Sequence, residues 1–128
     1  MHRIHLDRRH WCVLALALPA TLAAQKATEM YVPIGQSVGL SGRHTLIGRI
    51  AAADAASRSL RLDGGATTPA GVRVDERTVI WLDRSGLRQP NSYGSYADLQ
   101  PGRRIEVKFV GNDRAAGTAE WIKVDPSP

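Results

Sequence analysis

Residues 96–107 read YADLQPGRRIEV, and this stretch decides the fold. Ser95 stands before it as a helix cap, with Asp98 three residues later near the positive end of a short helical turn. Leu99 is the apolar residue expected to close one end of a small barrel, and the Pro-Gly pair at 101–102 is a turn signal that stops the helical turn. A structural role, the entry into a strand, is therefore enough to explain this stretch.

The next segment, RIEVKFV at 104–110, alternates strictly between apolar and polar residues. Its apolar residues Ile105, Val107 and Phe109 are expected to face the core. The polar residues between them, with Glu106 at the centre, are expected to face solvent. The pattern predicts a strand buried on one face, followed by a hairpin connection and a last strand, TAEWIKVD.

The residues upstream carry the same period of two. TLIGRIAA begins at Thr45, and Gly48 inside it indicates a bend or a close approach of two backbones. LRLD at 60–63 and VRVD at 72–75 mirror each other and predict an antiparallel pair. TVIWLD at 78–83 predicts a further short strand, and the polar tract after it, RSGLRQPNSYGS, predicts a loop.

Together these segments predict an all-β fold, a small five- or six-stranded OB-like barrel with one short helical turn before its last two strands. Three parts of the chain are expected: a signal peptide at 1–24, an extended N-terminal arm at 25–43 and the OB-like barrel domain at 44–125. The arm has three glycines, one proline and no sustained period. Tyr31, Val32 and Ile34 are its candidate anchors on the barrel.

The first 24 residues have the three parts of a secretory signal peptide: a start with three arginines, an apolar run at 13–24 and small residues before a polar segment. This predicts a periplasmic or secreted protein, cleaved between Ala24 and Gln25. The apolar run is shorter than the ~20 residues of a membrane span, so no retained span is expected. DRRHW at 7–11 resembles the signal of the twin-arginine export route, which stays open beside the general secretory route.

Cleavage changes the charge and removes the one cysteine, Cys12. The leader holds three of the 17 basic and one of the 12 acidic residues, so the net charge falls from +5 to +3. A net charge of +3 supports solubility and does not by itself indicate an anionic partner. The exported domain has no disulfide, so its hydrophobic core has to hold the fold together.

Three motifs, IGRIAAADAASRSLRL, VRVDERTVIWLD and YADLQPGRRIEVKF, carry a family resemblance over about residues 45–124. They resemble the small secreted bacterial domains of the domain of unknown function 5666 family and their OB-like relatives. Leu99 and Gly102 match that family's Leu-x-x-Gly stop before an alternating strand. The resemblance implies a fold and a compartment, and it brings no catalytic residues.

The residues available for metal binding or catalysis are few. One histidine, His44, and one methionine, Met30, follow the leader. The usual zinc set needs about four ligands from Cys, His and carboxylate, so no metal site and no cofactor are expected. No G-x-S-x-G elbow is present, and we expect no enzyme. The alternative that stays open is a small-ligand or metal carrier of the cell envelope, in which His44, Met30 and Trp81 or Trp121 would bind copper.

Nucleic acid is not expected as a partner, because LRLD and VRVD carry no aromatic side chains on which bases stack. The remaining function class is a non-catalytic binding or interaction module of the cell envelope. Its candidate site is the polar loop, where basic and aromatic residues gather. The candidate ligand-binding residues, for an envelope glycan, peptide or protein, are Arg84, Arg88, Asn91, Tyr93 and Tyr96.

Overall fold

The computed structural model describes residues 29–63, 71–112 and 117–127 of the chain. The predicted signal peptide, residues 1–24, lies outside the described residues. The chain divides into two compact units, Met1–Tyr31 and Val32–Pro128. Every strand of the described residues belongs to the second unit. In the described part of the chain, no helix has the length and hydropathy that a membrane span requires.

Short strands dominate the second unit, as the sequence predicts, and three single 3-10 turns interrupt them. The elements in chain order are β1 (Thr45–Asp54), β2 (Ser59–Asp63), β3 (Val72–Arg73), β4 (Val79–Leu82), η1 (Ser85–Leu87), β5 (Ser92–Tyr93), η2 (Tyr96–Asp98), β6 (Arg104–Phe109), η3 (Val110–Asn112) and β7 (Ala119–Val124). The fold class is therefore all-β.

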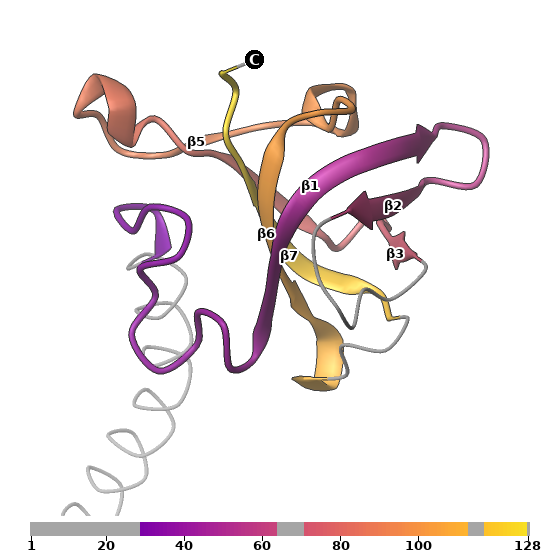
Figure 1. Ribbon diagram of the computed structural model, residues 1–128, viewed down its shortest axis with the longest axis horizontal. Helices are drawn as coiled ribbons and strands as arrows, with labels where there is room; N and C mark the ends of the chain where they lie inside the picture. The colour runs from indigo at the N-terminus through magenta and orange to yellow at the C-terminus, as the bar shows by residue number, and fades with distance from the viewer. Residues whose placement is uncertain (1–28, 64–70, 113–116, 128) are drawn as a thin grey trace, which may run out of the picture. The chain divides into compact units, whose positions relative to one another are not determined.

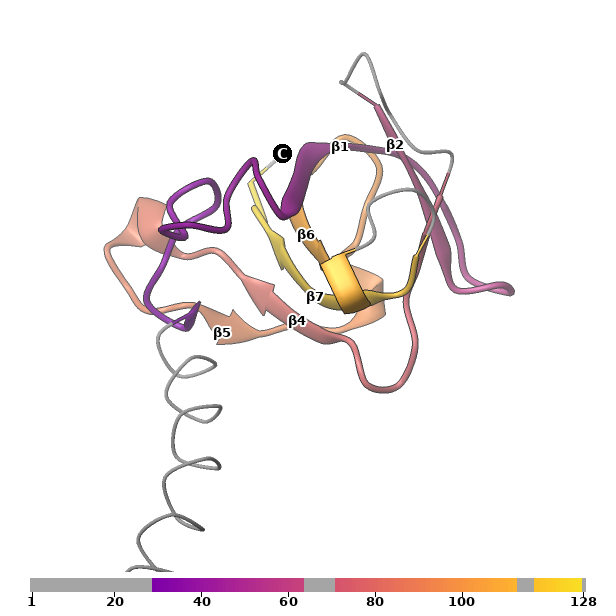
Figure 2. The same ribbon diagram turned by 90° about the horizontal axis from the view of Figure 1, so that it is seen from below.

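The seven strands form one mixed sheet in the order β3-β2-β1-β6-β7-β4-β5. Neighbouring strands are antiparallel except β4 and β7, which are parallel. β1 is long and bent, and it joins β2 on one side to β6 on the other (Figure 1). β4 and β5 lie at the end of the sheet away from β2 (Figure 2). The mirrored segments predicted to pair do so as β2 and β3.

The prediction of a five- or six-stranded barrel needs correction, because the sheet has seven strands and does not close. The strand that the sequence did not predict is β5, which lies in the tract expected to be a loop. β3 and β4 are separate as predicted, and in the turn between them the Asp75 carboxylate accepts hydrogen bonds from the backbone N–H groups of Arg77 and Thr78. The sheet still curls, since β3 meets the segment before β7 through the single bridge Arg73↔Thr118.

One face of the curled sheet holds the hydrophobic core. The alternating residues of β6 enter it as predicted, and Leu99 joins them from the turn after η2. The predicted cap of that turn is present, because the Ser95 N–H donates to the Asp98 carboxylate at 2.8 Å. The core consists of Ile50, Leu60, Leu62, Val72, Val74, Ile80, Leu99, Ile105, Val107, Phe109, Ala119, Ile122 and Val124.

Gly48 allows the close backbone approach that the sequence indicates. A Cβ at this position of β1 would lie 2.7 Å from the carbonyl oxygen of Asp63 at the end of β2. Real Cβ atoms do not come this near to a backbone oxygen, so any side chain here pushes β1 and β2 apart.

The outer face of β6 differs from the prediction, because Glu106 is fully buried instead of facing solvent. Residues 32–43 of the arm, which belong to the second unit, fold back over this face in a series of turns and cover it. Ile34 anchors the arm as predicted and is buried, whereas Tyr31 is exposed. The polar tract after β4 is also more ordered than a plain loop, since it contains η1 and the short edge strand β5.

We expect Gly48→Ala to lower the free energy of unfolding by about 1–3 kcal/mol, because the new methyl group overlaps the Asp63 carbonyl. Urea denaturation measures this change. Gly86→Ala is the matched control, since nothing lies within 4 Å of a Cβ at Gly86. Its effect should stay within about 0.5 kcal/mol, and equal losses in the two variants would contradict the steric explanation.

Candidate functional site

The loop singled out by sequence connects β4 to β5, and its two arginines flank η1. Arg84 is half-buried at the start of the turn and donates a hydrogen bond to the side chain of Gln89. Arg88 ends the turn in the left-handed conformation, at φ 55°, and is exposed. The short turn thus holds two guanidinium groups four residues apart at the surface.

Two large apolar side chains lie on the same connection. Leu87 in η1 is 68 % exposed and Tyr93 in β5 is 69 % exposed. Tyr93 pairs with Trp81 in the sheet, so its backbone is fixed while its ring remains in solvent. Arg84, Leu87, Arg88 and Tyr93 all lie on η1, next to it or on the edge strand β5, and we call this set of residues the basic-aromatic surface.

Asn91 and Tyr96, the other two candidates, make contacts inside the domain. Asn91 is buried and its side-chain amide donates to the carbonyl of Val32 at 3.2 Å. The Tyr96 hydroxyl lies 2.8 Å from the carbonyl of Asp54 and 3.0 Å from that of Ser59, and so it joins η2 to the β1–β2 hairpin. Burial and the Asp54 charge raise the Tyr96 pKa, which keeps this hydroxyl protonated as a donor. Neither residue belongs to the basic-aromatic surface.

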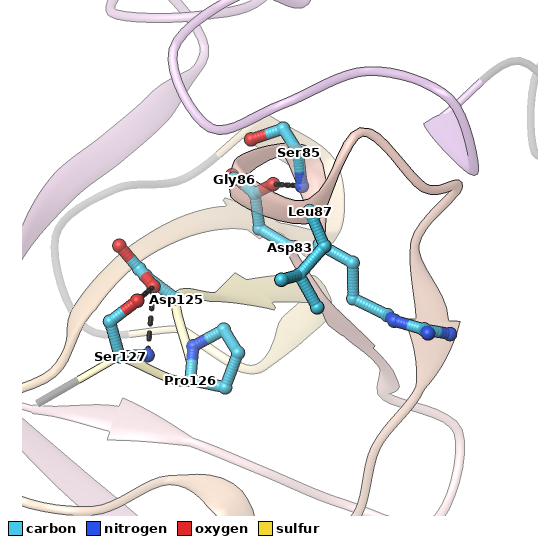
Figure 3. A pocket seen from close by; sticks show the side chains of 8 residues that line it. Asp83, Ser85, Gly86, Leu87, Asp125, Pro126 and Ser127 are labelled. Carbon is cyan, nitrogen blue, oxygen red and sulfur yellow. Dashed lines mark hydrogen bonds between the residues drawn. The ribbon is translucent and has the colours of Figure 1, made fainter.

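Beside this surface lies a pocket of about 490 Å³. The loop residues Asp83–Leu87 form one side and the C-terminal residues Asp125–Ser127 form the other (Figure 3). The Asp125 carboxylate accepts hydrogen bonds from the Ser127 N–H at 2.9 Å and the Ser127 hydroxyl at 2.7 Å. The pocket thus combines carboxylates, hydroxyls and the Arg84 side chain with the apolar groups of Leu87 and Pro126.

Asp83 connects the pocket to the arm. One carboxylate oxygen accepts from the N–H of Ser85 at 2.9 Å and the other from the N–H of Ile34 at 3.0 Å. Burial by itself raises the Asp83 pKa, but these amide hydrogen bonds and the nearby charge of Lys123 lower it more. The net result is a pKa below the ordinary value, so the folded state favours the ionised carboxylate.

Beneath the arm lies a second cluster of polar side chains, which the sequence did not predict. Glu106 of β6 and Lys123 of β7 face each other in register, and both are 0 % exposed. The Glu106 carboxylate accepts from the Gly35 N–H at 2.9 Å, the Ser41 hydroxyl at 2.6 Å and the Thr45 hydroxyl at 2.7 Å. The Lys123 ammonium donates to the Ser37 hydroxyl at 3.0 Å.

Both tryptophans of the second unit lie on this covered face. The Trp81 and Trp121 ring centroids are 6.0 Å apart, at an interplanar angle of 50°. The Lys123 ammonium is 4.9 Å from the Trp121 ring centroid, within the range of a cation–π contact. The alternation of β4 and β7 separates these residues from the core, but only the position of the arm reveals that they are buried.

The described residues contain no cluster of three or more His, Cys, Asp and Glu side chains that could hold a metal ion. Of the copper candidates, His44 is exposed just before β1, while Trp81 and Trp121 are buried on the covered face. No family model, curated protein or solved structure matches this chain.

Because the folded state lowers the Asp83 pKa, ionised Asp83 stabilises the fold above its unfolded pKa near 3.9, and this contribution is lost as pH falls through the folded value. Asp83→Asn, which cannot accept both amide hydrogen bonds, should lower the free energy of unfolding at pH 7 by about 1–2 kcal/mol. The difference from wild type should shrink as the pH is lowered below 4 in a series of denaturant titrations.

The matched control is Asp63→Asn, at an exposed carboxylate at the end of β2. Its effect at pH 7 should stay within about 0.5 kcal/mol. A difference between Asp83→Asn and wild type that remains constant from pH 7 to pH 3 would contradict the role assigned to the ionised carboxylate.

Proposed function

We propose that this protein is an exported, non-catalytic binding module of the bacterial cell envelope, and that it binds an acidic glycan at the edge of its sheet. Export follows from the leader at 1–24, and the relationship to the domain of unknown function 5666 family is part of the same proposal. The proposed site is the basic-aromatic surface together with the adjoining pocket.

The observation that carries the proposal is the exposure of Tyr93 and Leu87 beside two arginines on one short connection. Tyrosine and arginine are enriched where proteins bind partners, because each joins a large contact area to a hydrogen-bonding group. A tyrosine ring held in solvent by a paired strand loses little further conformational entropy on binding.

The pocket chemistry favours a glycan over a protein partner. A sugar acid presents hydroxyl groups, which can donate to the carboxylates of Asp83 and Asp125, and a carboxylate, which can accept from Arg84 or Arg88. The serine hydroxyls of the pocket can both donate and accept. A concave site with a few polar groups of mixed sign is typical of small-ligand and oligosaccharide recognition.

We expect an oligogalacturonate probe to raise the thermal unfolding midpoint by several degrees, since a ligand at a hundred times its Kd adds about 2.7 kcal/mol. A neutral dextran oligomer should give no shift. The combined change Arg84→Ala, Arg88→Ala and Tyr93→Ala should abolish the shift, because it removes both anion donors and the exposed ring.

Arg61→Ala with Arg77→Ala is the control, because both arginines are exposed and lie outside the connection between β4 and β5. This variant loses the same arginine charge and should keep the full shift. A shift that survives the triple change would refute the proposed site. If Cu²⁺ is the only probe that stabilises the protein, the glycan-binding proposal is refuted and the copper carrier is favoured.

A further inference from the structure

The outer face of β6, β7 and β4 is unusual for a surface covered by its own chain. Glu106 and Lys123 are completely buried there, next to Trp81 and Trp121. Burying a charged pair is costly, and an apolar pair of similar size is often equally stable or more so. Stability alone therefore gives no reason for these residue types. Aromatic side chains with a small number of fixed polar or charged groups are typical of a ligand-binding site.

The arm makes the contacts that such a ligand would make. Two successive backbone N–H groups donate to carboxylates: that of Ile34 to Asp83, and that of Gly35 to Glu106. The carbonyl of Val32 accepts from Asn91. Backbone groups of the arm thus supply three of the contacts. Residues 32–42 carry no charge. The face is therefore complementary to a neutral peptide that presents its backbone N–H and carbonyl groups.

The arm itself is weakly anchored. Ile34 is the one apolar residue within 32–42 that is fully buried, and Val38 is 98 % exposed. Gly35, Gly39 and Gly42 all have positive φ, at 84°, 77° and 77°, and glycine loses the most conformational entropy on ordering. A segment with few apolar contacts and several ordered glycines opens more easily than the sheet beneath it.

The arm also fits the face imperfectly. Among the described residues, the indole N–H of Trp81 has no hydrogen-bond partner although its nitrogen is buried. A buried donor without an acceptor is destabilising, and a native structure keeps one only for a reason. An occupant that brings an acceptor to this N–H would bind the face better than the arm does.

We propose that β6, β7 and β4 form a peptide-binding face. The arm, residues 32–42, occupies this face until a ligand displaces it. The partner is a neutral peptide segment of another protein. It keeps the backbone contacts to Asp83 and Glu106 and adds an acceptor for the Trp81 indole N–H. This inference does not depend on the glycan site, and either can fail without the other.

The first test is native-state hydrogen exchange on the full chain. The amides of Ile34 and Gly35 should exchange through a local opening, at least about 100-fold faster than the amides of β6 and β7. If the amides of the arm and of the sheet are equally protected and exchange only through global unfolding, the proposal that the arm can be displaced is refuted.

The second test measures binding of a synthetic peptide with the sequence of residues 32–42. The full chain carries Trp11→Phe, which leaves Trp81 and Trp121 as its only tryptophans, so intrinsic fluorescence reports the covered face. Ile34→Ala weakens the arm and should bind the peptide at least about tenfold more tightly than wild type, because the open fraction rises. Val38→Ala, on the same arm but in solvent, should bind like wild type.

A scrambled peptide of the same composition should not bind to either variant. If Ile34→Ala does not fold, Ser41→Ala weakens the arm more mildly, by removing one hydroxyl bond to Glu106. Failure of the peptide to bind a variant whose arm is open by hydrogen exchange would overturn the proposal. So would binding of a neutral N-acetylglucosamine tetramer, measured by the same fluorescence, in place of the peptide.

Discussion

The buried carboxylate of Glu106 is the constraint on which the arrangement of the second unit depends. Burying a carboxylate in a protein interior is costly unless hydrogen bonds to its oxygens and a nearby opposite charge offset the loss of hydration. Gly35, Ser41 and Thr45 supply the hydrogen bonds, and Lys123 lies opposite in the register of β6 and β7. Since two of the three donors belong to the arm, the arm must fold back over the sheet for the carboxylate to be buried.

The core lies on the other face, and its residues follow the alternation of apolar and polar residues that is visible in the sequence. Alternation in β6 separates Ile105, Val107 and Phe109 from their polar neighbours, and these three residues are buried as predicted. The glycine in β1 could also be interpreted from the sequence. A glycine within an apolar strand suggests close packing, and the backbone of Asp63 indeed leaves no room for a side chain at Gly48.

The same alternation is wrong for Glu106, for a physical reason. A period of two assigns residues to two faces of a sheet, but it does not tell whether the second face meets water or another segment. The cover comes from turns more than sixty residues earlier in the chain, and these turns have no period of their own. Asn91 and Tyr96 illustrate the same limit, because their partners Val32 and Asp54 are distant in sequence.

Asp83 would couple the two proposed sites thermodynamically if both bind their ligands. Its carboxylate lines the pocket and also accepts the N–H of Ile34, the anchor of the arm. A ligand whose hydroxyl group competes for this carboxylate would weaken the anchor and raise the open fraction of the arm. By linkage, a peptide on the covered face would change the affinity of the pocket by the same factor. One shared carboxylate would thus couple the edge of the sheet to its covered face.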